Sequence, residues 1–95
     1  MSENGNKKNL NELYNLFAKI DNAEDFRILL DDLCTYKELE QMAGRIAAAK
    51  LFIEGKTYNQ VIEATNISSA TLSRVSRCVQ LGQGYRKFLT KEEKK

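Results

Sequence analysis

The segment from Tyr58 to Val79 limits the fold of this chain more than any other, because it is patterned as two short helices around a tight turn. Its apolar residues stand at the spacing with which two helices pack at a steep angle, namely Val61, Ile67, Leu72 and Val75. Asn66 stands where such a turn needs a left-handed residue, a conformation that Asn tolerates. Thr57 and Ser68 can cap the two helices. We therefore predict a helix-turn-helix over residues 57–79.

Basic side chains are concentrated in and after this segment. From Ala64 to Lys91 the chain contains no Asp or Glu, and the window holds five basic residues, Arg74, Arg77, Arg86, Lys87 and Lys91. Residues 1–35 carry four basic and seven acidic side chains, whereas residues 36–95 carry eleven and six. A basic helix-turn-helix is typical of proteins that approach a phosphate backbone, so we expect double-stranded DNA as a partner.

The second helix of the motif carries most of the predicted DNA contacts. Its N-terminal turn is the part that enters the major groove, where small residues permit close approach and hydroxyls can bond to base edges or phosphates. Asn59 and Gln60, at the start of the preceding helix, are placed to reach the backbone, and Ser68 is equally well explained as a cap. The predicted DNA-binding residues are Asn59, Gln60, Ser68, Ser69, Ala70, Thr71, Ser73, Arg74 and Arg77.

Composition favours helices and excludes several classes of function. The 95 residues include no proline and five glycines, and helix-forming residue types are frequent. The longest apolar runs are only a few residues, so we expect no membrane span, no signal peptide and a cytoplasmic location. There is no histidine, and Cys34 and Cys78 lack metal-ligand spacing, so we expect no metal site, no catalytic residues and no enzyme. Both thiols are expected to be small buried hydrophobes.

We expect an all-α fold of about six helices. Residues 1–8 are polar and without periodicity, which predicts a flexible tail before a single all-helical domain over residues 9–95. Two amphipathic helices are predicted next, one ending near residue 20 and one over residues 23–34.

A long helix is predicted to begin after Thr35, which forms a capping box with Glu38, and to end before Gly55. It is apolar on most sides, which indicates burial on most sides, and one short chain can hardly surround it. We therefore expect a partner to cover the apolar surface, most simply a second copy in an isologous homodimer. A compact monomeric bundle is the alternative.

Three blocks of residues resemble the tryptophan-repressor family, and more closely its small YerC/YecD-type members. The blocks are Thr35-x-x-Glu38-x-Glu40-x-Met42-x-x-Arg45, then Glu54-Gly55, then Ser69-Ala70-Thr71-Leu72-Ser73-Arg74. The resemblance implies an interlocked all-helical homodimer that places two recognition helices on half-sites about one helical turn (~34 Å) apart. It also implies a last helix over residues 82–91, whose Tyr85, Phe88 and Leu89 complete the dimer core.

The resemblance further implies a small-molecule pocket between the long helix and the recognition helix. The ligand contacts of the family match Thr35, Arg45 and Arg74, and two arginines facing one gap can hold a flat ring and a carboxylate. Val75 and Cys78 stand where the repressor has glycine and serine; a valine narrows the slot, and a thiol is a poor partner for an ammonium group. We expect no required cofactor, with an aromatic amino acid corepressor as the candidate effector and tryptophan disfavoured.

Two functions stay open on these observations. The first is a homodimeric, sequence-specific DNA-binding transcriptional regulator, a repressor with or without a ligand. The second is a helical protein-interaction module or co-regulator without specific DNA binding of its own, which Glu63 and the modest net charge of +2 favour. DNA binding that weakens steeply with salt would favour the first, and equal affinity for random DNA the second.

Overall fold

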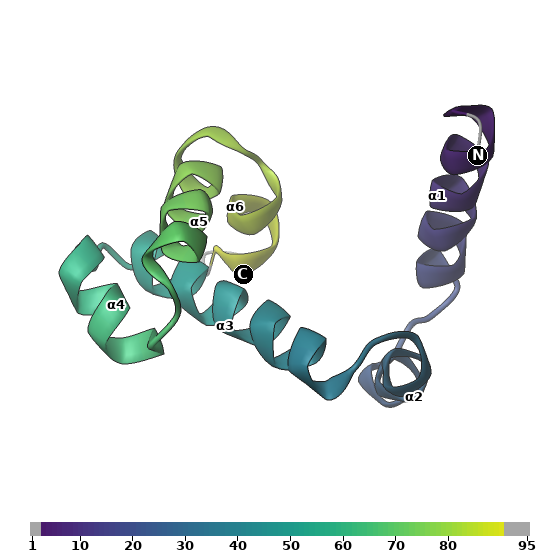
Figure 1. Cartoon of the computed structure of the whole chain (residues 1–95), viewed down its shortest axis with the longest axis horizontal. Helices are drawn as coiled ribbons and strands as arrows, with labels where there is room; N and C mark the ends of the chain where they lie inside the picture. The colour runs from purple at the N-terminus through teal and green to yellow at the C-terminus, as the bar shows by residue number, and fades with distance from the viewer. Residues whose placement is uncertain (1–2, 91–95) are drawn as a thin grey trace. The chain divides into compact units, whose positions relative to one another are not determined.

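The computed structural model describes residues 3–90, and within that range the protein consists of helices without strands (Figure 1). The helices are α1 (Glu3–Ala18), α2 (Ala23–Leu33), α3 (Tyr36–Ile53), α4 (Tyr58–Thr65), α5 (Ser69–Leu81) and α6 (Gly84–Leu89). The predicted all-α fold of about six helices is therefore confirmed. The contacts group the chain into two compact units, Met1–Tyr36 and Lys37–Lys95, where a single domain over residues 9–95 was expected.

The first helix begins earlier than its sequence suggests. Residues 3–8 are the first turns of α1, where a flexible tail was predicted over residues 1–8, and residues 1–2 lie outside the described part of the chain. No proline interrupts this stretch, and its asparagines, lysines and Gly5 weaken a helix by at most about 1 kcal/mol per residue without stopping it.

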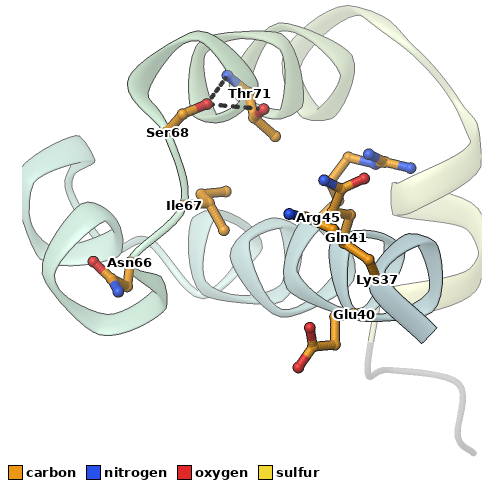
Figure 2. Close-up of a pocket in the computed structure, with 8 residues that line it drawn as sticks. All are labelled: Lys37, Glu40, Gln41, Arg45, Asn66, Ile67, Ser68 and Thr71. Atoms are coloured by element: carbon orange, nitrogen blue, oxygen red, sulfur yellow. Dashed lines mark hydrogen bonds between the residues drawn. The ribbon is translucent and has the colours of Figure 1, made fainter.

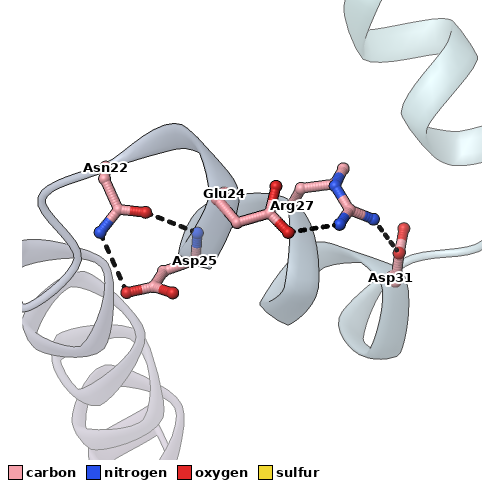
Figure 3. A network of polar contacts seen from close by, with 5 residues as sticks. All are labelled: Asn22, Glu24, Asp25, Arg27 and Asp31. Carbon is pink, nitrogen blue, oxygen red and sulfur yellow. Dashed lines mark hydrogen bonds and ion pairs between the residues drawn. The ribbon is translucent and has the colours of Figure 1, made fainter.

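The second helix is held by local polar contacts at its start (Figure 3). Asn22 is the N-cap of α2, and its Oδ1 accepts the Asp25 N–H at 2.8 Å. One turn further on, Arg27 pairs with Glu24 at 2.7 Å and with Asp31 at 3.3 Å. All three side chains of this ion-pair network are more than half exposed, so the network contributes little to stability.

The first unit has little core of its own. The rings of Phe17 and Phe26 meet edge to face at 5.0 Å and hold α1 against α2. None of the described residues up to Tyr36 is buried, and several large apolar side chains are at least 40% exposed, namely Leu10, Tyr14, Leu16, Ile28, Leu33 and Tyr36. Within this unit, the contact between the two rings is therefore the main apolar contact that the described side chains make.

The second unit contains the hydrophobic core. The buried side chains are Ala48, Ala49, Val61, Leu72, Val75 and Val79, and partly buried residues from α3 to α6 surround them. The predicted inward positions of Val61, Leu72 and Val75 are confirmed, with exposed fractions of 1% or less. On α3 the burial is confined to the two alanines, and Ile46 is 43% exposed. Within one chain, α3 is thus buried on one side and not on most sides.

The end of α3 is fixed by Gly55, as its position in the sequence predicts. Gly55 has a φ of 97°, the Lys56 N–H bonds to the Leu51 carbonyl at 3.0 Å, and the Gly55 N–H bonds to the Phe52 carbonyl at 2.9 Å. This pair of bonds is a Schellman motif, which satisfies carbonyls that the helix end would leave without partners. The chain is thereby turned from α3 into the helix-turn-helix.

Replacing Gly55 with alanine should lower the free energy of unfolding by about 1–2 kcal/mol, because a Cβ is strained at this backbone conformation. Gly84→Ala is the matched control, since a Cβ at either glycine would meet no atom within 4 Å and only Gly55 has a positive φ. Urea unfolding followed by circular dichroism, at one protein concentration, measures both. Equal stability of the two variants would contradict the left-handed conformation of Gly55.

Candidate nucleic-acid interface

The helix-turn-helix lies close to its predicted limits. Thr57 is the N-cap of α4, and α5 runs two residues past Val79 to Leu81. Asn66 ends α4 in the left-handed conformation, with φ 58° and ψ 30°, and its N–H bonds to the Ile62 carbonyl at 3.0 Å. The predicted role of Asn66 in the turn is confirmed.

Gln60 is part of the cap of α4. Its Oε1 accepts the Thr57 N–H at 2.8 Å, and its own N–H donates to Thr57 Oγ1 at 3.2 Å, which makes a capping box. The amide nitrogen of the Gln60 side chain makes no contact within the cap and is the group most free for the DNA contact predicted from the sequence. Asn59, beside it, is exposed.

Ser68 and Thr71 hold the first turn of α5. Ser68 Oγ accepts the Thr71 N–H at 3.2 Å and donates to Thr71 Oγ1 at 3.0 Å. Ser68 is therefore confirmed as the N-cap of α5, and both hydroxyls, which the sequence also assigns to DNA, already take part in the local structure.

The exposed face of α5 carries most of the other predicted DNA contacts. The exposed members of the predicted set on this helix are Ser69, Ala70, Ser73, Arg74 and Arg77. The side chains of the first turn are small, and the two arginines follow one and two turns later. This arrangement can approach a duplex closely at the helix start and bring guanidinium groups to phosphates or to guanine edges.

Tyr58 is a functional candidate that sequence reasoning missed. Its hydroxyl donates to the Ser69 carbonyl at 3.1 Å and lies 3.2 Å from Ser73 Oγ, so it joins the start of α4 to the first half of α5. Its ring lies 6.5 Å from that of Phe52. The only sign of this contact in the sequence was that a tyrosine stands at the start of a helix, at a position where the apolar pattern required no large side chain.

The other basic residues of the acid-free window differ in role. Arg86 Nε donates to the Val79 carbonyl at 2.8 Å and so closes the C-terminal end of α5. Lys87 lies 5.5 Å above the ring of Phe88. Lys91 lies outside the described residues. Arg74 and Arg77 are thus the basic residues that α5 itself presents to solvent.

A hollow of about 390 Å³ lies between α3 and the start of α5 (Figure 2). It is lined by Lys37, Glu40, Gln41, Arg45, Asn66, Ile67, Ser68 and Thr71. Of the three predicted ligand residues only Arg45 lines it; Arg74 is not among the lining residues, and Thr35 belongs to the first unit. Lys37, Gln41 and Arg45 recur every four residues along one face of α3.

The two residues that disfavour tryptophan lie elsewhere. Val75 is 1% exposed and belongs to the core. Cys78 lines a separate, largely apolar hollow of about 390 Å³ with Tyr85 and Phe88. Neither Cys78 nor Cys34 is fully buried and neither forms a disulfide, so the expectation of buried thiols is met only in part.

Within the described residues, no group of three or more Cys, Asp or Glu side chains is arranged to hold a metal ion. The same part of the chain has no helix that is both long and apolar enough to cross a membrane.

Comparison with known proteins assigns the helix-turn-helix to a family. The family profile described as Trp repressor protein matches residues 8–93. The chain belongs to the Trp repressor family. At the level of this family it is a DNA-binding transcriptional regulator, and Trp repressor proteins are regulators and not enzymes.

Two relatives of this Trp repressor family member agree with the assignment. The uncharacterized protein YerC of Bacillus subtilis (strain 168) is 37% identical over 75 residues, which cover 79% of this chain and 72% of YerC. A crystal structure from Staphylococcus aureus, provisionally assigned as a Trp repressor, has 34% sequence identity and a TM-score of 0.79. That match covers 86% of this chain and 83% of the other, which confirms the Trp repressor-like fold.

Replacing Ser68 with alanine should lower the free energy of unfolding by about 1 kcal/mol, because α5 loses its N-terminal cap. Ser69→Ala removes a neighbouring hydroxyl that makes no capping bond, so its stability should stay within about 0.5 kcal/mol of the wild type. Urea unfolding compares the two variants. If Ser69→Ala were the more damaging change, the cap would be wrongly placed.

Proposed function

We propose that the protein is a sequence-specific transcriptional repressor that acts as a homodimer and inserts α5 into the major groove of DNA. The observation that carries the proposal is the exposed face of α5, where small side chains in the first turn are followed by Arg74 and Arg77. Membership of the Trp repressor family also supports a DNA-binding role. Small residues set how closely the helix can approach base edges, and the arginines supply affinity for phosphates.

The homodimer is supported by apolar surface that one chain leaves uncovered. In the first unit these side chains include Leu10, Ile28 and Leu33, each about half exposed, and on α3 Ile46 is 43% exposed. Large apolar side chains gathered on short helices are typical of surfaces that a partner covers. A closed two-fold assembly is the simplest arrangement in which both copies cover the same surface.

We infer that no aromatic corepressor is required for DNA binding. The hollow beside Arg45 is lined by no aromatic ring, and Ile67 is its only apolar lining residue. Val75, which stands where the repressor has glycine, is buried in the core and does not line this hollow. Lys37 and Arg45 would favour a carboxylate or another anion over an indole at this place.

Reversing the charge of Arg74 or of Arg77 should weaken binding to promoter DNA by at least about tenfold, because attraction to a phosphate or base is replaced by repulsion. Lys19→Glu makes the same change in net charge at an exposed position outside the helix-turn-helix and should leave affinity within about twofold. Titration of labelled promoter fragments at several salt concentrations gives both the affinity and the salt slope. The slope should fall by about one for each phosphate that the variant no longer neutralises.

Unchanged affinity of both arginine variants would overturn α5 as the reading helix. Equal affinity of the wild type for promoter and random DNA would favour the interaction-module alternative. The same titrations with added L-tryptophan should give the same affinity, and a large increase would contradict the inference that no aromatic corepressor is required.

The protein should elute with twice the 10.9 kDa mass of one chain in size-exclusion chromatography with light scattering. Ile28→Glu places a charge on the uncovered apolar surface and should shift the mass towards the monomer at low micromolar concentration, because burying an unpaired carboxylate is unfavourable. Gln80→Glu introduces the same group at an exposed polar position of α5 and should leave the mass unchanged. A monomeric wild type would refute the homodimer.

A further inference from the structure

The hydroxyl of Tyr58 joins two helices of the motif through a short chain of hydrogen bonds. It donates to the Ser69 carbonyl at 3.1 Å and lies 3.2 Å from Ser73 Oγ. Ser69 and Ser73 are one turn apart on α5, whereas Tyr58 is the first residue of α4. The three groups therefore connect the start of one helix to the exposed face of the other.

The number of available protons determines which group donates in each of these hydrogen bonds. A phenol has one proton, and a carbonyl oxygen can only accept, so the proton of Tyr58 is used on the Ser69 carbonyl. The contact between the two hydroxyls then requires Ser73 to donate its own proton to the oxygen of Tyr58. Ser73 has no other proton, so it is left with lone pairs alone and can act towards any further partner only as an acceptor.

Ser73 is exposed and lies on the face of α5 that is proposed to meet DNA. In the major groove, adenine N6 and cytosine N4 are donors, whereas guanine N7 and O6 and thymine O4 are acceptors. An acceptor-only hydroxyl would bond to adenine or cytosine and would be repelled by guanine, thymine and phosphate oxygens.

We propose that Tyr58 is a positioning residue that holds the Ser73 hydroxyl as an acceptor and thereby selects adenine or cytosine at one base of each half-site. This inference rests on the proposed function, since it requires α5 to read DNA. Beyond the proposed function, it names the type of base that is read at one position. It also names Tyr58, which lies outside α5, as the residue that determines this choice. Tyr58 itself need not touch the DNA.

The test is selection of bound sequences from a random duplex library by the wild type, Tyr58→Phe and Ser73→Ala. The base pair concerned is the one whose preference changes in Ser73→Ala. The wild type should select one base pair there over the other three, and Tyr58→Phe should reduce that preference about fivefold, the size expected for one hydrogen bond. Preferences at the other positions and affinity for random DNA should stay within about twofold, and Tyr36→Phe, which removes an exposed phenol outside α4 and α5, should change nothing.

Three results would overturn the inference. They are the absence of any position whose base preference changes in Ser73→Ala, an undiminished preference in Tyr58→Phe, and an equal loss at all positions, which is expected if Tyr58 only stabilises the fold. The double variant adds a further check. In the Ser73→Ala background, Tyr58→Phe should have little further effect on that base, and additive effects would show that the two hydroxyls act independently.

A measurement on the free protein separates failure of this inference from failure of the proposed function. If the wild type selects no sequence, the proposed function fails and the base preference fails with it. If it selects a sequence, the carbon chemical shift of the Ser69 carbonyl should still change in Tyr58→Phe and stay constant in Tyr36→Phe. An unchanged shift at Ser69 would remove the hydrogen-bond chain on which the inference depends, even though DNA binding itself remained.

Discussion

The close packing of α3 against the helix-turn-helix depends on two alanines, Ala48 and Ala49, neither of which has any exposed surface. Because their side chains end at Cβ, the larger apolar residues Val61, Leu72 and Val75 can share one small core with them. Larger residues at these two places would force the helices apart or off their rotamers. The orientation of α5 relative to α3 thus depends first on these two small side chains of α3.

Gly44 extends the same constraint one turn towards the start of α3. A Cβ on this glycine would lie 3.2 Å from Cγ2 of Ile67, the apolar residue of the turn. Glycine in the middle of a helix costs about 1 kcal/mol relative to alanine, so its presence needs a compensating reason. Close approach of the turn to α3 supplies that reason.

Polar contacts within the helix-turn-helix also fix the positions of α4 and α5. Gln60 and Ser68 cap the two helices, and Tyr58 binds the start of one to the face of the other. Several hydroxyls and amides that could bond to DNA are therefore already used in fixing the geometry. If the motif binds DNA as proposed, groups that are fixed in this way would lose less conformational entropy on binding.

Local chemistry explains which features the sequence could predict. A cap, a C-terminal glycine or a left-handed turn depends on residues within about four positions, so Ser68, Gly55 and Asn66 could all be placed correctly. The inward residues of α4 and α5 followed from the spacing of the helix-turn-helix. The family assignment needed three separated blocks of residues, since a lone helix-turn-helix pattern occurs in many families.

Contacts across helices could not be predicted in the same way. The bonds of Tyr58 to α5 and of Arg86 to Val79 depend on the angle at which two helices cross, which no local pattern encodes. Of the predicted ligand residues, only Arg45 lines the hollow beside the turn, and no local pattern indicates which side chains line such a hollow. The early start of α1 was missed because a polar, aperiodic stretch is compatible with both a tail and an exposed helix.

The exposed helices of the first unit indicate that the proposed dimer would also stabilise the fold of each chain. α1 and α2 have 16 and 11 residues, lengths at which isolated helices are marginal in water, and none of their described residues is buried. Burial against a second copy would supply the apolar contacts that they lack, at roughly 25 cal/mol for each Å² removed from water. Under that arrangement, association would stabilise the folded chain and set the spacing of two α5 helices at once. Half-site spacing and stability would then depend on the same interface, so a substitution that loosened it would affect both.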